Sequence, residues 1–208
     1  MTLTIASLFD LSKFAHRHLW DGLENPWEIL DVLSEYLLGL KLGKIDVDIP
    51  KGVYLVNPEQ ISIGKNSIIE PGSFIQGPCV LGESTQVRHG AYIRGNVITG
   101  NHCVIGHATE IKGSIMLDAA KAPHKAYVGD SVIGNSANLG AGSVLANLRL
   151  DGKQVRINSQ NSGRRKLGAL IGDGAQLGCN CVTNPGTIVL KESYIKPCTA
   201  VGGVISNG

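Results

Sequence analysis

The stretch from residue 63 to residue 92 reads IGKNSI, IEPGSF, IQGPCV, LGESTQ and VRHGAY, five consecutive six-residue units that each begin with an aliphatic residue. The fifth position of these units holds Ser67, Ser73, Cys79, Thr85 and Ala91, all of them small or β-branched. The phase is lost at 118–127 and again at 148–169, and it returns after each interruption. A period of six predicts short strands joined by turns, which must coil and stack because one unit cannot bury a core alone.

This pattern resembles the left-handed parallel β-helix of hexapeptide-repeat acyltransferases, in which three units form one triangular coil. The resemblance implies a mainly β protein of about eight coils, with 118–127 and 148–169 as excursions from the coil. The left hand comes from the resemblance, because parallel crossovers are ordinarily right-handed. Residues 18 apart should then stack at about 4.8 Å, the spacing of neighbouring strands.

The composition excludes several classes of protein. Of the 208 residues, 43% are hydrophobic and 17% are charged, with a net charge of +2, so we expect a folded domain and no general affinity for nucleic acid. The 27 glycines follow no Gly-X-Y period, which excludes collagen. We find no apolar run long enough to span a membrane and no signal peptide. With five cysteines, this favours a cytoplasmic protein with reduced thiols.

A change of composition near Lys44 divides the chain into an N-terminal helical segment (1–48) and a β-helix acyltransferase domain (49–208). Asn25, Pro26 and Glu28 predict a helix start, with Asn25 as cap, Pro26 in the first turn and Glu28 completing a capping box. The apolar stripe that follows is interpreted as a packing face.

Two cations stand out because of the 18-residue stacking. Arg94 and Lys112 are 18 apart, so two like charges would lie at strand spacing and repel one another unless an anion lies between or beside them. One interpretation is a phosphate clamp, with Arg94 as a bidentate donor. The other is that both side chains splay into solvent.

The two interruptions hold further candidates. His124 in the first is a plausible general base, although most histidines in loops are merely solvated. The second alternates around Asp151-Gly152, which predicts a hairpin. It carries six cations against Asp151, namely Arg149, Lys153, Arg156, Arg164, Arg165 and Lys166. This segment is either a solvated arm or a phosphate-binding surface; without interleaved aromatics, single-stranded nucleic acid is disfavoured.

The loop motifs make the resemblance more specific. APHKAYVGD (122–130), NLGAG (138–142) and Ala146-Asn147 resemble the acetyltransferase domain of the bifunctional glucosamine-1-phosphate acetyltransferase/N-acetylglucosamine-1-phosphate uridyltransferase family and its free-standing sugar-phosphate acetyltransferase relatives. The resemblance covers residues 52 to 205. Leu148 replaces an aromatic residue of the bifunctional enzyme, the basic loop is longer, and no Gly-rich nucleotidyltransferase signature is present.

Carried over residue by residue, the resemblance implies a site made of a base, phosphate and sugar contacts, and acetyl-CoA contacts. His124 matches the catalytic base and Asn147 the residue beside the reacting acyl group. The substrate contacts are Arg94, Lys112, Tyr127 and Asn138, with either Lys153 or Lys166 as the loop lysine, and the acetyl-CoA contacts are Ala141 and Cys179. Cys79, Cys103 and Cys181 are expected to be inert core thiols.

The expected activity is therefore transfer of an acetyl group from acetyl-CoA to an amino-sugar phosphate, with glucosamine-1-phosphate as the leading candidate. His124 acts as general base, without a covalent intermediate and without a required metal. The alternatives are an acyltransferase acting on a nucleotide-linked amino sugar and a non-catalytic assembly scaffold. A zinc-dependent carbonic anhydrase of this fold is disfavoured because a third histidine two coils upstream is missing. The resemblance also implies a homotrimer with sites between neighbouring chains.

Overall fold

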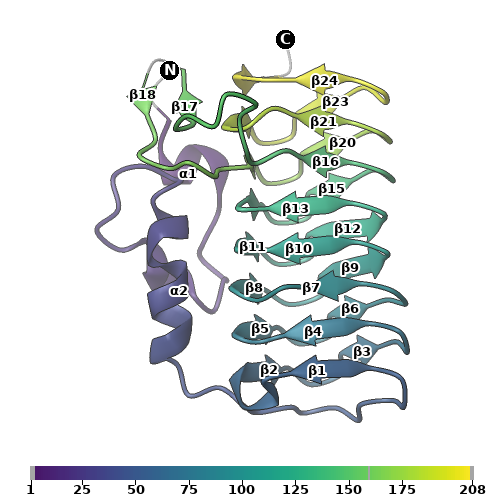
Figure 1. Cartoon of the computed structure of the whole chain (residues 1–208). Coiled ribbons are helices and arrows are strands. Elements are labelled where there is room, and N and C mark those ends of the chain that lie inside the picture. The colour runs from purple at the N-terminus through teal and green to yellow at the C-terminus, as the bar shows by residue number, and fades with distance from the viewer. Residues whose placement is uncertain (1–2, 159, 207–208) are drawn as a thin grey trace.

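The computed structural model describes residues 3–158 and 160–206, and most of these residues form a parallel β-helix with three long sheets (Figure 1). The β1 sheet contains β1 (Tyr54–Val56), β4 (Phe74–Gln76), β7 (Tyr92–Ile93), β10 (Glu110–Lys112), β13 (Tyr127–Gly129), β16 (Val144–Leu145), β21 (Val182–Thr183) and β24 (Ala200–Val201). The β2 sheet contains β2 (Ile61–Ile63), β5 (Cys79–Leu81), β8 (Val97–Thr99), β11 (Ser114–Met116), β14 (Val132–Ile133), β19 (Ala169–Ile171), β22 (Thr187–Val189) and β25 (Val204–Ile205). The β3 sheet contains β3 (Ile68–Ile69), β6 (Gln86–Val87), β9 (Val104–His107), β12 (Lys121–His124), β15 (Asn138–Leu139), β20 (Gln176–Leu177) and β23 (Tyr194–Ile195).

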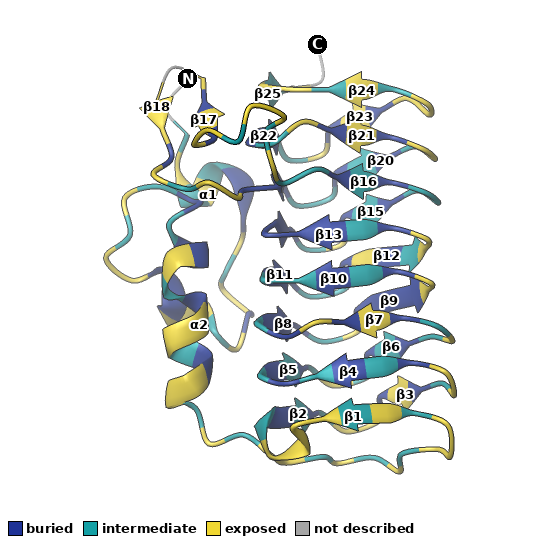
Figure 2. Ribbon diagram, in the orientation of Figure 1, coloured by how far each residue is buried: buried dark blue, intermediate teal, exposed yellow. Residues whose placement is uncertain are grey.

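The chain visits the sheets in the order β1, β2, β3, so each circuit makes one coil. Two of the sheets have eight strands and the third has seven, which confirms the prediction of about eight coils. One aliphatic residue per strand points inward, as for Ile75, Ile93 and Ile111, which are all fully buried. The hexapeptide period is therefore the period of these inward positions (Figure 2).

Small polar residues hold the corners of the coil together from inside. The Ser67 hydroxyl donates to the carbonyl of Gly82 at 2.9 Å and accepts from the backbone N–H of Thr85 at 3.0 Å. Burial raises the pKa of the Cys79 thiol to about 12, and it does the same for Cys103. Because only the thiolate is a good nucleophile, both thiols are chemically inert, as expected.

The expected excursion at 118–127 is wrong. Residues Lys121–His124 form β12, which pairs with β9 on one side and β15 on the other. The offset between paired residues is 18 from Tyr92 to Glu110 but 17 from Glu110 to Tyr127. Ile111 pairs with Ile93, and Ser114 pairs with Val97 in the coil before. The corner from Ile93 to Val97 advances four residues along the chain, whereas the corner from Ile111 to Ser114 advances only three. One residue missing at a corner shifts the hexapeptide phase without displacing the chain from the coil.

The N-terminal segment lies beside the β2 sheet and covers it (Figure 1). It contains α1 (Ile5–Leu8), the 3₁₀ helix η1 (Arg17–Trp20) and α2 (Ile29–Gly39); a second 3₁₀ helix, η2 (Pro58–Gln60), lies between β1 and β2. Ile98, Ile115 and Val132 point outward from the β2 sheet and are buried against this segment. The segment thus forms a second hydrophobic core outside the coil.

The helix α2 begins three residues later than predicted, at Ile29. Only half of the expected capping box forms. The Glu28 carboxylate accepts from the backbone N–H of Asn25 at 3.0 Å, but no side chain caps α2 itself. Residues 26–28 form a turn ahead of the helix.

Residues 146–168 lie between β16 and β19 and leave the coil (Figure 1). We call 148–169 the basic arm. The expected hairpin around Asp151-Gly152 is wrong: the antiparallel pair is β17 (Arg156–Ile157) with β18 (Gln160–Asn161). At the expected position, the Asp151 carboxylate binds the Arg149 guanidinium and the N–H of Gly152 donates to the Arg149 carbonyl, so a local turn forms instead.

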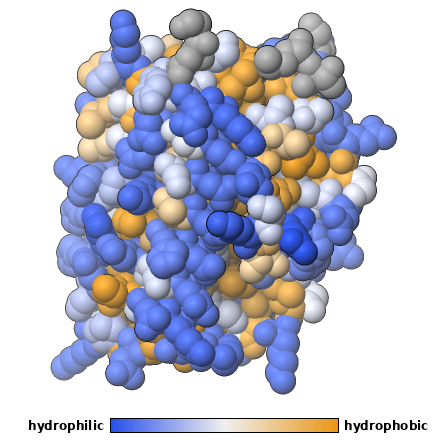
Figure 3. Space-filling view, turned by 180° about the vertical axis from the view of Figure 1, so that it is seen from behind, coloured by the Kyte–Doolittle hydropathy of each residue, from blue (hydrophilic) through white to orange (hydrophobic). Residues whose placement is uncertain are grey.

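The surface opposite to the view of Figure 1 is largely hydrophilic on the side away from the N-terminal segment (Figure 3). Within the described part of the chain, no helix is both long enough and apolar enough to cross a membrane.

Candidate active site

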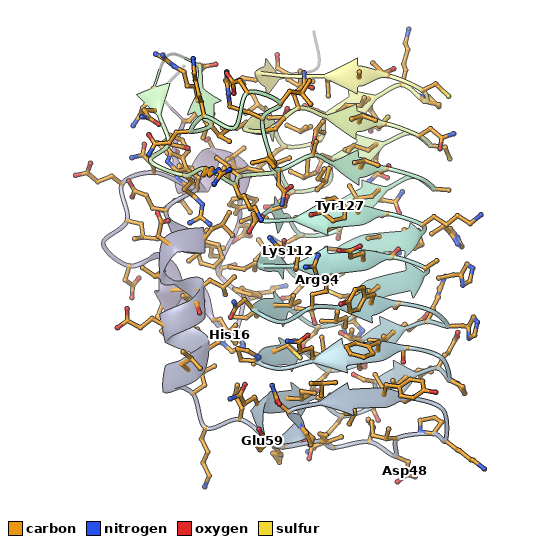
Figure 4. The ribbon with its side chains drawn as sticks, in the orientation of Figure 1. His16, Asp48, Glu59, Arg94, Lys112 and Tyr127 are labelled. Carbon is orange, nitrogen blue, oxygen red and sulfur yellow. The ribbon has the colours of Figure 1, made fainter. Side chains whose placement is uncertain are left out.

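Arg94, Lys112 and Tyr127 come from three consecutive coils and extend from the same face of the molecule, the outer face of the β1 sheet (Figure 4). The strands position them because alternate residues of a strand point to opposite faces. Ile93, Ile111 and Val128 point into the coil and are fully buried. Their neighbours Arg94, Lys112 and Tyr127 therefore point outward.

Four side chains form a connected polar cluster at the end of β13. The Lys112 ammonium lies 2.7 Å from the Asp130 carboxylate. The Asn147 amide donates to the same carboxylate oxygen at 2.5 Å and to the Tyr127 hydroxyl at 3.2 Å. We call Lys112, Asp130, Asn147 and Tyr127 the polar cluster. The structure thus brings together three of the residues that the sequence predicted.

Gly129 makes this contact possible. A Cβ atom at this position would lie 2.6 Å from the Asn147 amide nitrogen and 2.7 Å from the Tyr127 hydroxyl. Only glycine lets the Tyr127 side chain lie along its own strand and reach Asn147.

Arg94 is also paired, but more openly. Its guanidinium donates to the Glu110 carboxylate at 2.7 Å and lies over the Tyr92 ring, 5.8 Å from its centroid. The sequence predicts either a bound anion or splayed side chains to relieve the repulsion between Arg94 and Lys112. Instead, each cation has its own carboxylate partner, Glu110 or Asp130, so the pair carries no excess positive charge.

Glu110 and Asp130 are the residues that the sequence reasoning missed as members of this site. Asp130 is only 8% exposed, yet it accepts from both Lys112 and Asn147. The signal was present, because Asp130 follows Lys112 by 18 residues and Glu110 follows Arg94 by 16, each about one coil.

His124 lies at the corner between the β3 and β1 sheets, in a column of equivalent residues. Each member of the column precedes a residue with positive φ. From His107 onward, the N–H of that following residue donates to the carbonyl of the column member one coil earlier. In this way Lys125 binds His107, Gly142 binds His124, and Asn180 binds Ala141. The column is His89, His107, His124, Ala141 and Cys179.

The two lower histidines of the column are held by the backbone. The His89 and His107 rings stack 5.7 Å apart, at an angle of 8°. Each Nδ1 is hydrogen-bonded to a carbonyl one coil earlier, Pro71 for His89 and His89 for His107. Among the described residues, the His124 imidazole has no such partner and is exposed to solvent. His89 and His107 are exposed as well, so His124 differs from them in that, within the described part of the chain, no hydrogen bond to the backbone fixes its ring.

Ala141 and Cys179 follow His124 in the same column, so the structure places the two expected acetyl-CoA contacts directly above the expected base. Ala141 has no side chain beyond its methyl group, which leaves room next to His124. Cys179 is exposed, whereas Cys181 is buried and burial raises its pKa.

The remaining predicted residues lie elsewhere. Asn138 belongs to β15 and extends from the outer face of the β3 sheet, not the face that carries the polar cluster. Lys153 and Lys166 are exposed in the basic arm. Among the described residues, neither ammonium group makes an ion pair, so the structure does not choose between them.

The arm is nevertheless anchored at the polar cluster. The backbone N–H of Leu167 donates to the Asn147 carbonyl at 2.9 Å, and that of Gly168 donates to the Asp130 carbonyl at 2.8 Å. The first and last residues of the arm thus both lie next to the polar cluster. In the part of the chain that the structure describes, no group of three or more His, Cys, Asp or Glu side chains could hold a metal ion.

Comparison with known proteins identifies related chains. A family model described as the GMPPB C-terminal domain matches residues 75–162. A bifunctional sugar-1-phosphate nucleotidylyltransferase/acetyltransferase of Sulfurisphaera tokodaii is 33% identical over 198 residues, which are 91% of this chain and 48% of that protein. A bifunctional protein GlmU of Methanococcus maripaludis is 41% identical over 188 residues, which are 85% of this chain and 43% of that protein. The chain spans about half the length of these curated relatives.

Among solved structures, the UDP-N-acetylglucosamine acyltransferase of Francisella novicida is similar with a TM-score of 0.57 at 16% identity, covering 76% of this chain and 62% of that one. This likeness shows the fold alone, and it confirms the predicted left-handed parallel β-helix. The family resemblance inferred from the loop motifs is confirmed as well: the chain is a hexapeptide-repeat protein related, over most of its own length, to the bifunctional sugar-1-phosphate nucleotidylyltransferase/acetyltransferases.

Proposed function

We propose that this protein transfers an acetyl group from acetyl-CoA to the amino group of an amino-sugar phosphate, with glucosamine-1-phosphate as the leading candidate. One observation carries the proposal: the exposed His124 and the polar cluster flank the same strand, β13. The names of the relatives, which pair sugar-1-phosphate nucleotidylyl transfer with acetyl transfer, support it.

In the proposed reaction the amine of the sugar attacks the thioester carbonyl of acetyl-CoA. The His124 imidazole accepts the proton of the attacking amine, and the tetrahedral intermediate collapses with departure of the coenzyme A thiolate. Ala141 and Cys179 would flank the acyl group. A covalent acetyl-enzyme is not needed, and Cys179 has no hydrogen-bonded base among the described residues.

The polar cluster would hold the sugar. Its free donors and acceptors are fixed before the substrate arrives, because Lys112, Asn147 and Tyr127 are hydrogen-bonded to each other or to Asp130. Such preorganisation lowers the entropic cost of orienting a small polar substrate. Arg94, which is exposed, would contact the phosphate.

The direct test is to mix the protein with acetyl-CoA, a series of amino sugars and a thiol reagent that detects released coenzyme A. We expect release with an amino-sugar phosphate, and a loss of about 100-fold or more in kcat for His124→Ala, because the base acts in the transition state. His89→Ala, two coils away in the same column, serves as the control and should keep normal turnover. Normal turnover by His124→Ala would refute the mechanism.

A second comparison tests the phosphate contact. Arg94→Ala should act mainly by raising the KM for the phosphorylated sugar, since that contact is made equally in the ground and transition states. Equal rates with glucosamine and glucosamine-1-phosphate would leave acetyl transfer intact but exclude this role for Arg94.

We propose that the protein is a cytoplasmic homotrimer in which Asn138 of one chain and the polar cluster of a neighbour line one site. Support comes from their positions on two different faces of a single chain. A nucleotide-linked amino sugar is the alternative acceptor.

A further inference from the structure

The positive charge of this protein is concentrated in the basic arm. Residues 148–169 contain six cations and one acidic residue. Subtracting these from the 19 cationic and 17 acidic residues of the chain leaves 13 and 16. The coil and N-terminal segment together are therefore net negative, and the arm is the part of the molecule that attracts anions.

Three of the six cations of the arm line a cavity, and one of these three, Arg149, is paired with Asp151. A hollow of about 440 Å³ is lined by Arg149, Lys153, Gln154, Arg156 and Asn161. Its size falls in the range of small-molecule sites. All five lining side chains are polar and none is aromatic, so the cavity offers charged and amide donors but no aromatic ring on which a base could stack.

The walls of this cavity are held in place rather than loose. The Asn161 amide donates to the Gln154 carbonyl oxygen at 2.7 Å, and the Gln154 amide donates to the Gly163 carbonyl at 3.2 Å. The Val155 and Ile157 side chains, on either side of Arg156, are buried in the hydrophobic core formed with the N-terminal segment. These contacts fix the backbone that carries the cationic side chains, as a ligand-binding site requires. A fully solvated arm would lack them.

Arg164 ties the arm to the N-terminal segment through an ion pair with Asp31 in α2. The arm is thus fastened at the polar cluster, in the second core and on α2. The cavity shares no lining residue with the polar cluster, but the arm that carries it is joined to that cluster where Leu167 and Gly168 bind the backbone of Asn147 and Asp130.

We infer that this cavity binds the phosphate groups of a nucleotide, in particular a diphosphate. Guanidinium and ammonium groups match phosphate oxygens, and the amides of Gln154 and Asn161 add neutral donors. Because the lining is cationic and contains no aromatic ring, it suits the phosphates better than the base.

This inference rests on the proposed function only in taking the nucleotide to be part of a substrate. Two sources of a diphosphate then exist: coenzyme A, with its adenosine 3′-phosphate and diphosphate, and the nucleoside diphosphate of a nucleotide-linked amino sugar. The shared chemistry is a diphosphate attached to ribose.

The test is equilibrium binding by calorimetry on the full chain, with coenzyme A and UDP as separate probes. Arg156→Gln and Lys153→Gln should each weaken binding of at least one probe about tenfold, the effect expected for one lost charge-assisted contact. Arg165→Gln is the matched control, an exposed cation of the same arm that does not line the cavity. It should bind both probes like the wild type.

Weakened binding of coenzyme A alone would assign the cavity to the acyl donor, and weakened binding of UDP alone would assign it to a nucleotide-linked acceptor. Weakening of both would mean that it accepts either diphosphate. Unchanged binding of both probes in both variants, or no binding of either probe by the wild type, would overturn the inference. Because binding is measured without turnover, a protein that binds a probe through Arg156 but transfers no acetyl group would refute the proposed function alone.

Discussion

Burial distinguishes the two ion pairs of the site at the level of single residues. The Lys112 and Asp130 side chains are 19% and 11% exposed, whereas those of Arg94 and Glu110 are 42% and 34% exposed. Removing one member of a largely buried pair leaves a desolvated charge without a partner, which is far more costly than losing a solvated pair. The polar cluster should therefore contribute to stability as well as to binding.

We predict that Lys112→Met lowers the free energy of unfolding by about 3 kcal/mol, because the Asp130 carboxylate stays buried without its cation. The matched variant Arg94→Met should cost about 0–1 kcal/mol. Urea denaturation at pH 7 measures both. Equal losses for the two variants would contradict the distinction between the pairs.

His16 lies beside Tyr36 and His18, and its protonation should make the stability of the protein depend on pH. Burial and the neighbouring His18 lower the pKa of His16, and its Nδ1 lies 2.7 Å from the Tyr36 hydroxyl. The His16 imidazole is therefore protonated at a higher pH in the unfolded chain than in the folded protein. Between the ordinary value of about 6.5 and the lowered pKa, the unfolded state binds more protons, so stability is lost as the pH falls through this window.

His16→Gln cannot titrate but can still bind Tyr36. We expect its stability to decrease less than that of the wild type between pH 7.5 and pH 5.5, as measured by denaturant midpoints at each pH. Parallel pH profiles for the two proteins would show that His16 does not produce the dependence.

At the scale of elements, the inward positions were predictable and the corners were not. Each strand must bury one side chain inside the coil, so every hexapeptide unit contains an aliphatic residue at that position, as at Ile75, Ile93 and Ile111. A corner has no such requirement, so the one-residue shortening between Ile111 and Ser114 looked like the start of a loop. His124 was consequently expected on an excursion, although it ends β12.

The basic arm shows the same limit. Asp-Gly is a common hairpin turn, but Arg149 is close enough to bind Asp151 and form a local turn. The positions of Val155 and Ile157 depend on packing in the core that includes the residues of α2 (Ile29–Gly39), which lie far earlier in the sequence. The cationic composition of the arm could be predicted from the sequence, whereas the cavity within it depends on this long-range packing.

The helix α2 offers a test of that second core. Leu33 is 2% exposed and faces the core, while Leu38 on the same helix is 65% exposed. We predict that Leu33→Ala lowers the free energy of unfolding by about 2–5 kcal/mol through loss of burial and a new cavity. Leu38→Ala should change it by less than about 0.5 kcal/mol. Similar values in a denaturant titration would mean that α2 is not packed on the β2 sheet in solution.

For the whole molecule, the three faces of the coil are not equivalent. The N-terminal segment covers the β2 sheet, but the other two faces keep large exposed hydrophobic side chains, including Tyr54 at 63%, Ile68 at 56% and Tyr194 at 66%. Tyr54 belongs to the β1 sheet, and Ile68 and Tyr194 belong to the β3 sheet. Two different uncovered faces can meet in a head-to-tail contact, and such contacts form a ring when the rotation between neighbouring chains closes.

We therefore predict that the protein sediments at about three times the mass of one chain at micromolar concentration. Because Asn138 lies on the β3 face and Lys112 on the β1 face, a ring would place Asn138 of one chain next to Lys112 of the next. Chains carrying Asn138→Ala and chains carrying Lys112→Met, each impaired alone, should then regain activity when co-expressed, since mixed rings contain some sites with both native residues. A monomer in sedimentation would contradict the ring, and a trimer without recovery would show that both residues of a site come from the same chain.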